Sequence, residues 1–174
     1  LVAGAEAEVH RLERLWSRFR PDSEISQLNE RTGQVIVVSP LTFELVRCAT
    51  EAHERTGGRF HPLLLRHLER IGYRRDWNPL HPPVPDPDLD DPALNDKPDP
   101  VANIELFPEL GAVRLPVGAR FDPGGIGKGL TVDRISEWCR AEGATTVCVD
   151  LGGDLRVFLT ELAATVYPDK KIHL

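Results

Sequence analysis

The residues most suited to chemistry form a glycine-rich segment in the second half of the chain, F-D-P-G-G-I-G-K-G at positions 121–129. Glycine at this density lets backbone N–H groups approach an anionic ligand, and the N-terminus of a following helix adds partial positive charge. Asp122 and Lys128 place one negative and one positive group beside that backbone. The segment therefore predicts a site for a phosphorylated ligand, with or without a metal. An ordinary strand-to-helix turn is the alternative.

Two familiar phosphate-binding patterns do not fit these residues. A Walker A loop needs glycine five positions before the Gly-Lys pair and Ser or Thr directly after it. Those positions hold Asp122 and Gly129. A dinucleotide fingerprint needs G-x-G-x-x-G, whereas Gly125, Gly127 and Gly129 fall on every second residue. We therefore expect a different architecture.

Composition bounds the protein class. A chain of 174 residues is long enough to bury the core of one domain. Its formal net charge of −6 argues against a general nucleic-acid binder, and no apolar run approaches the roughly 20 residues that span a bilayer. The chain contains no Met and opens at Leu1 within a helix-forming stretch, so we expect an internal N-terminus, upstream of which a signal peptide or lipid-attachment cysteine could have been present. Three widely spaced cysteines predict buried free thiols rather than a disulfide or zinc site, namely Cys48, Cys139 and Cys148.

Hydrophobic spacing and capping residues predict the helices that carry this segment. We expect helices at about 5–17, at 24–28 after an Asp22 or Ser23 cap, from Ser39-Pro40 to Gly57, and from Pro62 to Gly72. Another follows the glycines and ends near Gly143. The helix after Ser39-Pro40 is expected to bury Leu41, Leu45, Cys48 and Ala52, and the next one Leu64, Leu68 and Ile71.

Strands are expected between and after these helices along the sequence. Runs of β-branched and alternating residues predict extended segments at 34–38, 113–116, 119–121, 145–149 and 155–158, the fourth of them buried. Residues 150–154, D-L-G-G-D, form a second glycine turn that carries aspartates. Two such turns suggest two loops that converge on one ligand.

Residues 77–100 differ from the rest of the chain. They contain eight prolines and six aspartates with few aliphatic residues. Such a composition predicts an extended, mobile surface loop within one α+β unit, and a domain boundary is the alternative.

Four segments together resemble a known family. They are S-R-F-R-P-D-S-E-I-S-Q-L-N at 17–29, T-G-G-R-F-H-P at 56–62, D-P-G-G-I-G-K-G at 122–129 followed by V-D-R at 132–134, and D-L-G-G-D-L at 150–155. In this order they resemble the ApbE family of flavin transferases, the FAD:protein FMN transferases. The resemblance covers residues 1–158 and implies an α+β fold of the tunnelling-fold type, with mixed or antiparallel sheets and packed helices. It implies FAD as substrate and Mg²⁺ as cofactor.

The resemblance also implies site residues. Phe19 stands where the family has an aromatic at the flavin end of FAD, and a short run that lines the same cofactor falls on residues 59–61. Asp122 and Lys128 match FAD-contacting positions, and Gly125 matches the residue whose backbone carbonyl binds the metal. The expected FAD-binding set is Phe19, Arg59, Phe60, His61, Asp122 and Lys128.

Several of these residues have a simpler structural interpretation. Phe19 and Phe60 would also suit core packing, and His61, which replaces the family's usual aspartate, would suit a helix cap. Asn29 and Asp154 are expected to hold turns through side-chain-to-backbone hydrogen bonds. Asp133 and Arg134 are expected on a solvated or salt-bridged helix face.

The C-terminal tail departs from the family pattern. Glu161 and Thr165 have the i, i+4 spacing at which the family's metal-binding Asp and Thr lie, so their oxygens would share one helix face. A chance pair on an exposed helix is the alternative. The family's intervening motifs do not occur, so we expect one ApbE-like domain over 1–174 that lacks a stretch near 158–160.

The implied reaction is Mg²⁺-dependent transfer of FMN from FAD to a Thr or Ser hydroxyl of a target protein, with release of AMP. Two alternatives stay open: a FAD pyrophosphatase that gives FMN and AMP, and a non-catalytic FAD-binding protein. The partner would be a flavoprotein, without nucleic acid, and membrane association would come only through a lipid anchor. The family suggests an extracytoplasmic, cell-envelope location, with the cytoplasm as the alternative.

Overall fold

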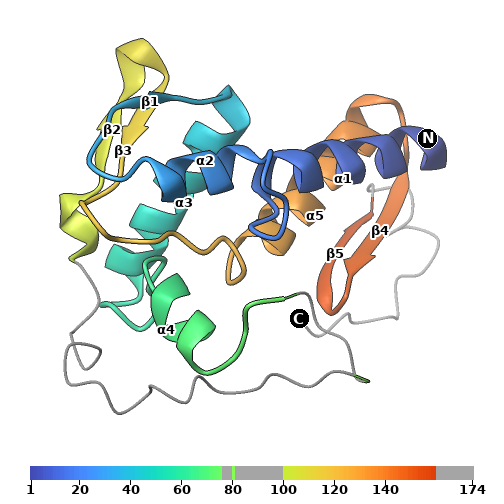
Figure 1. Cartoon of the computed structure of the whole chain (residues 1–174). Helices are drawn as coiled ribbons and strands as arrows, with labels where there is room; N and C mark the ends of the chain where they lie inside the picture. The colour runs from blue at the N-terminus through green and yellow to red at the C-terminus, as the bar shows by residue number, and fades with distance from the viewer. Residues whose placement is uncertain (76–79, 81–99, 160–174) are drawn as a thin grey trace. The chain divides into compact units, whose positions relative to one another are not determined.

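The computed structural model describes residues 1–75, 80 and 100–159 (Figure 1). They divide into two compact units: Glu13–Ile126, and Leu1–Leu12 together with Gly127 onward. The division between the units after Ile126 therefore falls inside the glycine-rich segment. The predicted loop over 77–100 lies outside the described residues apart from Leu80 and Pro100, and so do Glu161 and Thr165.

The larger unit, residues 13–126, combines short helices with a small antiparallel sheet. Its sheet has the order β1-β3-β2, with Val113 of β3 opposite Ile36 of β1 and Leu106 of β2. Figure 1 shows blue β1 beside yellow β2 and β3. The elements that lie wholly within this unit are α2 (Glu24–Glu30), β1 (Ile36–Val37), α3 (Pro40–Arg55), α4 (Leu65–Arg70), η2 (Val101–Asn103), β2 (Glu105–Phe107), η3 (Pro108–Leu110) and β3 (Ala112–Arg114).

Capping side chains fix the helix starts in this unit, as the sequence predicted. Ser23 accepts a hydrogen bond from the backbone N–H of Ser26 at the start of α2. Ser39 does the same for Thr42 at the start of α3, where proline occupies the first turn. Each cap satisfies a backbone donor that has no partner within the helix.

The core of the larger unit forms between these helices and β3. Fully buried side chains come from α2, α3, α4 and β3, and the largest in the unit is that of Phe121, whose exposed fraction is 0%. Burial of one such ring contributes about 1.5–3 kcal/mol. Phe121 is the residue before Asp122, so the core anchors the start of the glycine-rich segment. Other core residues are Ile25, Leu28, Leu45, Val46, Leu65, Val113 and Leu115.

The smaller unit contains α5 (Gly127–Ala141) and an antiparallel hairpin of β4 (Thr146–Leu151) and β5 (Asp154–Leu159), drawn in orange and red in Figure 1. Gly152 and Gly153 connect the strands with φ angles of 66° and 98°, which only glycine adopts readily. The core around Ile135, Cys139 and Val147 also includes part of α1 (Val2–Trp16), which contributes to both units.

Some local expectations were wrong. The helix predicted from Pro62 to Gly72 exposes Ile71 at 57%, because α4 ends at Arg70 and buries Leu65 instead. Cys48 is only half-buried, because α3 turns Val46 and Ala49 toward the core.

The strand expectations also needed correction. The predicted buried strand at 145–149 alternates instead, and Cys148 is exposed. The expected strand at 34–38 shortens to β1, and 119–121 is not a strand. All three cysteines are free thiols, as expected, but only Cys139 is buried.

Candidate functional site

The glycine-rich segment is divided between the two units rather than forming one loop. In the larger unit, the Asp122 N–H donates to the Pro62 carbonyl at 2.8 Å, and the Gly124 N–H donates to the Asp122 carboxylate at 3.3 Å. Gly124 and Gly125 are exposed. Gly127 already belongs to α5, so Lys128 and Gly129 lie in the first turn of a helix. The exposed backbone is therefore confined to Gly124 and Gly125 and is held by Asp122.

A buried arginine joins Asp122 to two aromatic rings. Arg18 Nε lies 3.4 Å from Asp122 Oδ1, and their side chains are 6% and 13% exposed. The Arg18 guanidinium carbon lies 4.3 Å from the ring centre of Phe19 and 4.4 Å from that of Tyr73. The guanidinium also donates to the Tyr73 carbonyl at 3.0 Å. Such stacking between a cation and ring faces is favourable, most of all out of water.

The two rings form a T-shaped pair. Their centres lie 6.0 Å apart with an interplanar angle of 86°. Phe19 is 37% exposed, so it is not simply a core residue. An exposed aromatic ring held in place by a buried cation suits contact with a planar ligand.

Phe60 packs against one of the exposed glycines, Gly125. A Cβ added to Gly125 would lie 2.7 Å from Phe60 Cε2, so only glycine fits beneath the ring. The Phe60 carbonyl lies 2.8 Å from His53 Nδ1, which must carry the proton because a carbonyl only accepts. The expected capping role of His61 is wrong, because Leu64 stands at the N-cap of α4 and no side chain caps that helix. His61 instead accepts from the Leu63 N–H at 3.3 Å, and its ring meets that of His53 edge-on at 4.9 Å.

Asn29 fixes the residue before Asp122. Its side-chain amide donates to the Phe121 carbonyl at 2.9 Å and accepts from the Phe121 N–H at 2.7 Å. We expected Asn29 to hold a local turn, but its partner lies 92 residues away in the chain. Three of the four motif segments therefore meet in the larger unit. The first contains Arg18 and Asn29, the second contains Pro62, and the third contains Asp122.

The fourth motif segment meets Lys128 in the smaller unit. Lys128 Nζ lies 3.1 Å from Asp154 Oδ2, and the two side chains are 56% and 42% exposed. Asp150 accepts from the Gly153 N–H at 2.9 Å and holds the glycine turn. Asp154 therefore pairs with a lysine rather than capping a turn, whereas Asp133 follows expectation and pairs with Arg156.

Comparison with known protein families agrees with the order of these segments. The ApbE family model matches residues 1–162. This chain belongs to the ApbE family. The comparison with curated proteins found no match.

Solved ApbE structures share the fold. The ApbE protein from Thermotoga maritima is 25% identical with a TM-score of 0.76, over 90% of this chain and 50% of that one. Pseudomonas stutzeri flavinyl transferase ApbE, in its apo form, is 20% identical with a TM-score of 0.73, over 89% and 48%. Vibrio cholerae flavin transferase ApbE is 21% identical with a TM-score of 0.73, over 90% and 49%. The predicted α+β class with antiparallel sheets is confirmed, and this chain spans about half the length of these ApbE proteins.

The metal half of the expected ApbE site is not represented among the described residues. There, no group of three or more His, Cys, Asp or Glu side chains could hold a metal ion. Gly125 is described and offers only its carbonyl, while Glu161 and Thr165 lie outside the described residues. In the same part of the chain, no helix is long and apolar enough to cross a membrane.

The residues that could hold FAD fit that ligand better. In the larger unit, Phe19 offers a ring, Gly124 and Gly125 offer exposed backbone, and the exposed Arg59 offers a cation. Lys128 is exposed too, but it belongs to the smaller unit. This set matches a ligand with aromatic rings and a diphosphate.

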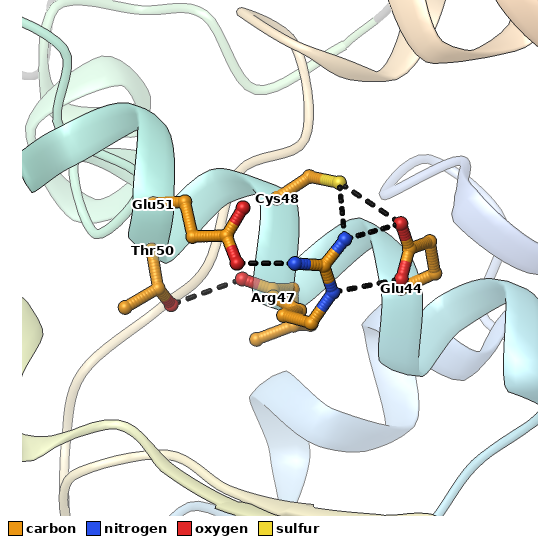
Figure 2. A network of polar contacts seen from close by, with 6 residues as sticks. Glu44, Arg47, Cys48, Thr50 and Glu51 are labelled. Carbon is orange, nitrogen blue, oxygen red and sulfur yellow. Dashed lines mark hydrogen bonds and ion pairs between the residues drawn. The ribbon is translucent and has the colours of Figure 1, made fainter. Parts of the chain in front are cut away.

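A second polar cluster, on α3, does not have the properties of an active site (Figure 2). Arg47 pairs with Glu44 at 2.6 Å and with Glu51, one turn apart along the same helix. Burial, and then a hydrogen bond to Glu44, raise the pKa of the Cys48 thiol to about 11. A thiol that stays protonated at neutral pH is a poor nucleophile, so this ApbE protein gains no cysteine chemistry there.

Sequence reasoning missed two members of the site. Arg18 lies within the first quoted motif, but a buried arginine has no spacing signal of its own. Tyr73 lies outside every quoted motif and 55 residues from Arg18. The one sequence signal that could have indicated Tyr73 is its aromatic side chain directly after Gly72, where a helical pattern ends.

Proposed function

We propose that this protein transfers FMN from FAD to a Thr or Ser hydroxyl of a target protein, with AMP as the second product. The observation that carries the proposal is the meeting of three family motifs around Asp122, through Arg18, Asn29 and Pro62.

The proposed chemistry needs positioning and charge more than covalent help. The acceptor hydroxyl oxygen bonds to the FMN phosphorus, the bond from that phosphorus to the bridging oxygen breaks, and AMP leaves with the electron pair. The hydroxyl proton is released to solvent. Phe19 and Phe60 would hold the ring end, and backbone N–H groups at Gly124 and Gly125 would hold the diphosphate. Lys128, in the smaller unit, is assigned to FAD by the family resemblance alone.

The remaining assignments are part of the same proposal. Arg59, His61 and Asp122 would line the cofactor. Magnesium dependence would involve the Gly125 carbonyl with Glu161 and Thr165, and a bound ion would neutralise diphosphate charge. The target would be a flavoprotein, and we propose an extracytoplasmic location, to be tested by cell fractionation.

The test is intact-mass spectrometry of the protein and a candidate flavoprotein after incubation with FAD and Mg²⁺. An FMN-sized adduct on the target, together with AMP, supports the transferase, and its loss on chelation with recovery on added Mg²⁺ supports the metal. AMP without an adduct indicates a pyrophosphatase. FAD binding without AMP indicates a binding protein.

A matched pair of variants tests the cation assigned to the diphosphate. Lys128→Gln should lower transfer at least tenfold, because it removes the positive charge in the first turn of α5. Arg140→Gln removes an exposed cation from the last turn of the same helix and should leave transfer unchanged. Equal effects of the two variants would contradict the assignment of Lys128.

A further inference from the structure

Arg18 occupies an unusual environment for a charged residue. Its side chain is 6% exposed, less than that of any other arginine for which an ion pair is described. A buried guanidinium needs a charge partner and hydrogen-bond acceptors, or its desolvation is uncompensated. Asp122 and the Tyr73 carbonyl supply these, at 3.4 Å and 3.0 Å.

The contacts of Arg18 reach two functional surfaces at once. One contact holds the Asp122 carboxylate, which in turn accepts from the Gly124 N–H and shapes the exposed glycines. The other contacts hold the rings of Phe19 and Tyr73, at 4.3 Å and 4.4 Å. A single planar side chain therefore fixes the exposed aromatic ring and the glycine segment relative to each other.

We propose that Arg18 is a positioning residue for FAD binding, and that Tyr73 positions the Phe19 ring through Arg18 and through their edge-to-face contact. This inference rests on the proposed function, because it assigns Phe19 and the glycines to FAD. Tyr73 acts only on the position of the Phe19 ring. Arg18 acts on both the ring and the glycine segment, so variants of the two residues should change ligand affinity in different ways.

The difference between Arg and Lys sharpens the proposal. Arginine stacks its flat guanidinium on ring faces and donates in several directions, whereas lysine presents a compact ammonium. Arg18→Lys keeps the positive charge opposite Asp122 but removes the stacking on Phe19 and Tyr73. Tyr73→Leu keeps the backbone carbonyl that accepts from Arg18 and removes only the ring.

The experiment measures the Kd of FAD and of ADP, which lacks the flavin, by calorimetry on purified protein whose fold is checked by circular dichroism. Tyr73→Leu should raise the Kd of FAD about tenfold, equal to about 1.4 kcal/mol, and change the Kd of ADP less than twofold. Arg18→Lys should raise both at least fivefold.

Arg114→Ala is the matched control. Arg114 also pairs with a carboxylate, Glu105 at 2.8 Å, and faces a ring, Phe107 at 5.9 Å, but it lies outside the proposed site. Its variant should bind both ligands as the wild type does.

Two results would overturn the proposal. The first is a FAD affinity within twofold of wild type in both the Arg18→Lys and the Tyr73→Leu variants. If Arg18→Lys does not fold, the affinity of Tyr73→Leu alone decides. The other is an equal loss of FAD and ADP affinity in Tyr73→Leu, which would indicate a general structural role. A folded wild-type protein that binds no FAD would instead refute the proposed function, so the two failures are distinguishable.

Discussion

Asn29→Ala should destabilise the protein strongly, although it removes only a small polar side chain. Asn29 is 8% exposed and lies inside α2. Its amide makes two hydrogen bonds to the backbone of Phe121, which is itself completely buried. Alanine removes both partners and leaves a buried N–H and a buried carbonyl unpaired.

The size of the effect follows from those two groups. A buried donor or acceptor left without a partner costs about 1–3 kcal/mol, more than a typical net hydrogen bond contributes. Two such groups, with part of the cost relieved by water entry, give an expected loss of about 2–4 kcal/mol. This is a large share of the roughly 5–15 kcal/mol that stabilises a typical protein. Asn29→Asp should be nearly as harmful, because a carboxylate accepts from the Phe121 N–H but cannot donate to its carbonyl.

Urea denaturation followed by circular dichroism measures the free energy of unfolding of each variant. Asn103→Ala is the matched control, because Asn103 is exposed in η2 and should change stability by less than about 0.5 kcal/mol. A loss below about 1 kcal/mol for Asn29→Ala would refute the reasoning. It would mean that the α2 contact does not hold the start of the glycine segment.

Three further predictions concern side chains near this segment and on α3. Gly125→Ala should cost about 1–3 kcal/mol by overpacking against Phe60, and a double-mutant cycle should show this cost largely removed in a Phe60→Ala background. Gly129→Ala should instead stabilise α5 by up to about 1 kcal/mol in urea denaturation, since the nearest atom to its Cβ would lie at 3.8 Å. Alkylation mapped by peptide mass spectrometry should label exposed Cys148 before Cys48 at pH 8. Because the pKa of Cys48 is raised to about 11, its labelling rate should rise about tenfold per pH unit up to pH 10. Equal labelling rates of Cys48 and Cys148 at pH 8 would contradict this prediction.

Local signals predicted much of the fold because the same residues that carry the signal make the contact. Ser39 caps α3 and Ser23 caps α2 as expected, since a cap involves groups only three residues apart. The paired glycines at 152 and 153 produced the expected hairpin turn for the same reason. Ile71 and Cys148 were misplaced because hydrophobic spacing does not reveal where a short helix ends or which strand face is covered.

The site itself depended on contacts that no local pattern encodes. Arg18 finds Tyr73 at a separation of 55 residues, and Asn29 finds Phe121 at 92. The motif order predicted which segments matter, and the family match confirmed the family. Which side chain in each segment makes the connection follows from packing, so the sequence named Asp122 but missed its buried partner.

The two ion pairs of the glycine-rich segment differ in what a ligand could displace. Lys128 and Asp154 are both about half exposed, and such a pair contributes about 0–1 kcal/mol. Arg18 and Asp122 are nearly buried, and removal of one partner from a buried pair costs about 3–5 kcal/mol. A ligand anion could therefore take Lys128 from Asp154 at little cost, whereas separating Arg18 from Asp122 would cost several kcal/mol, about 3–5. Within the proposed function, Lys128 is the cation that changes partners during binding, and Arg18 keeps its partner throughout.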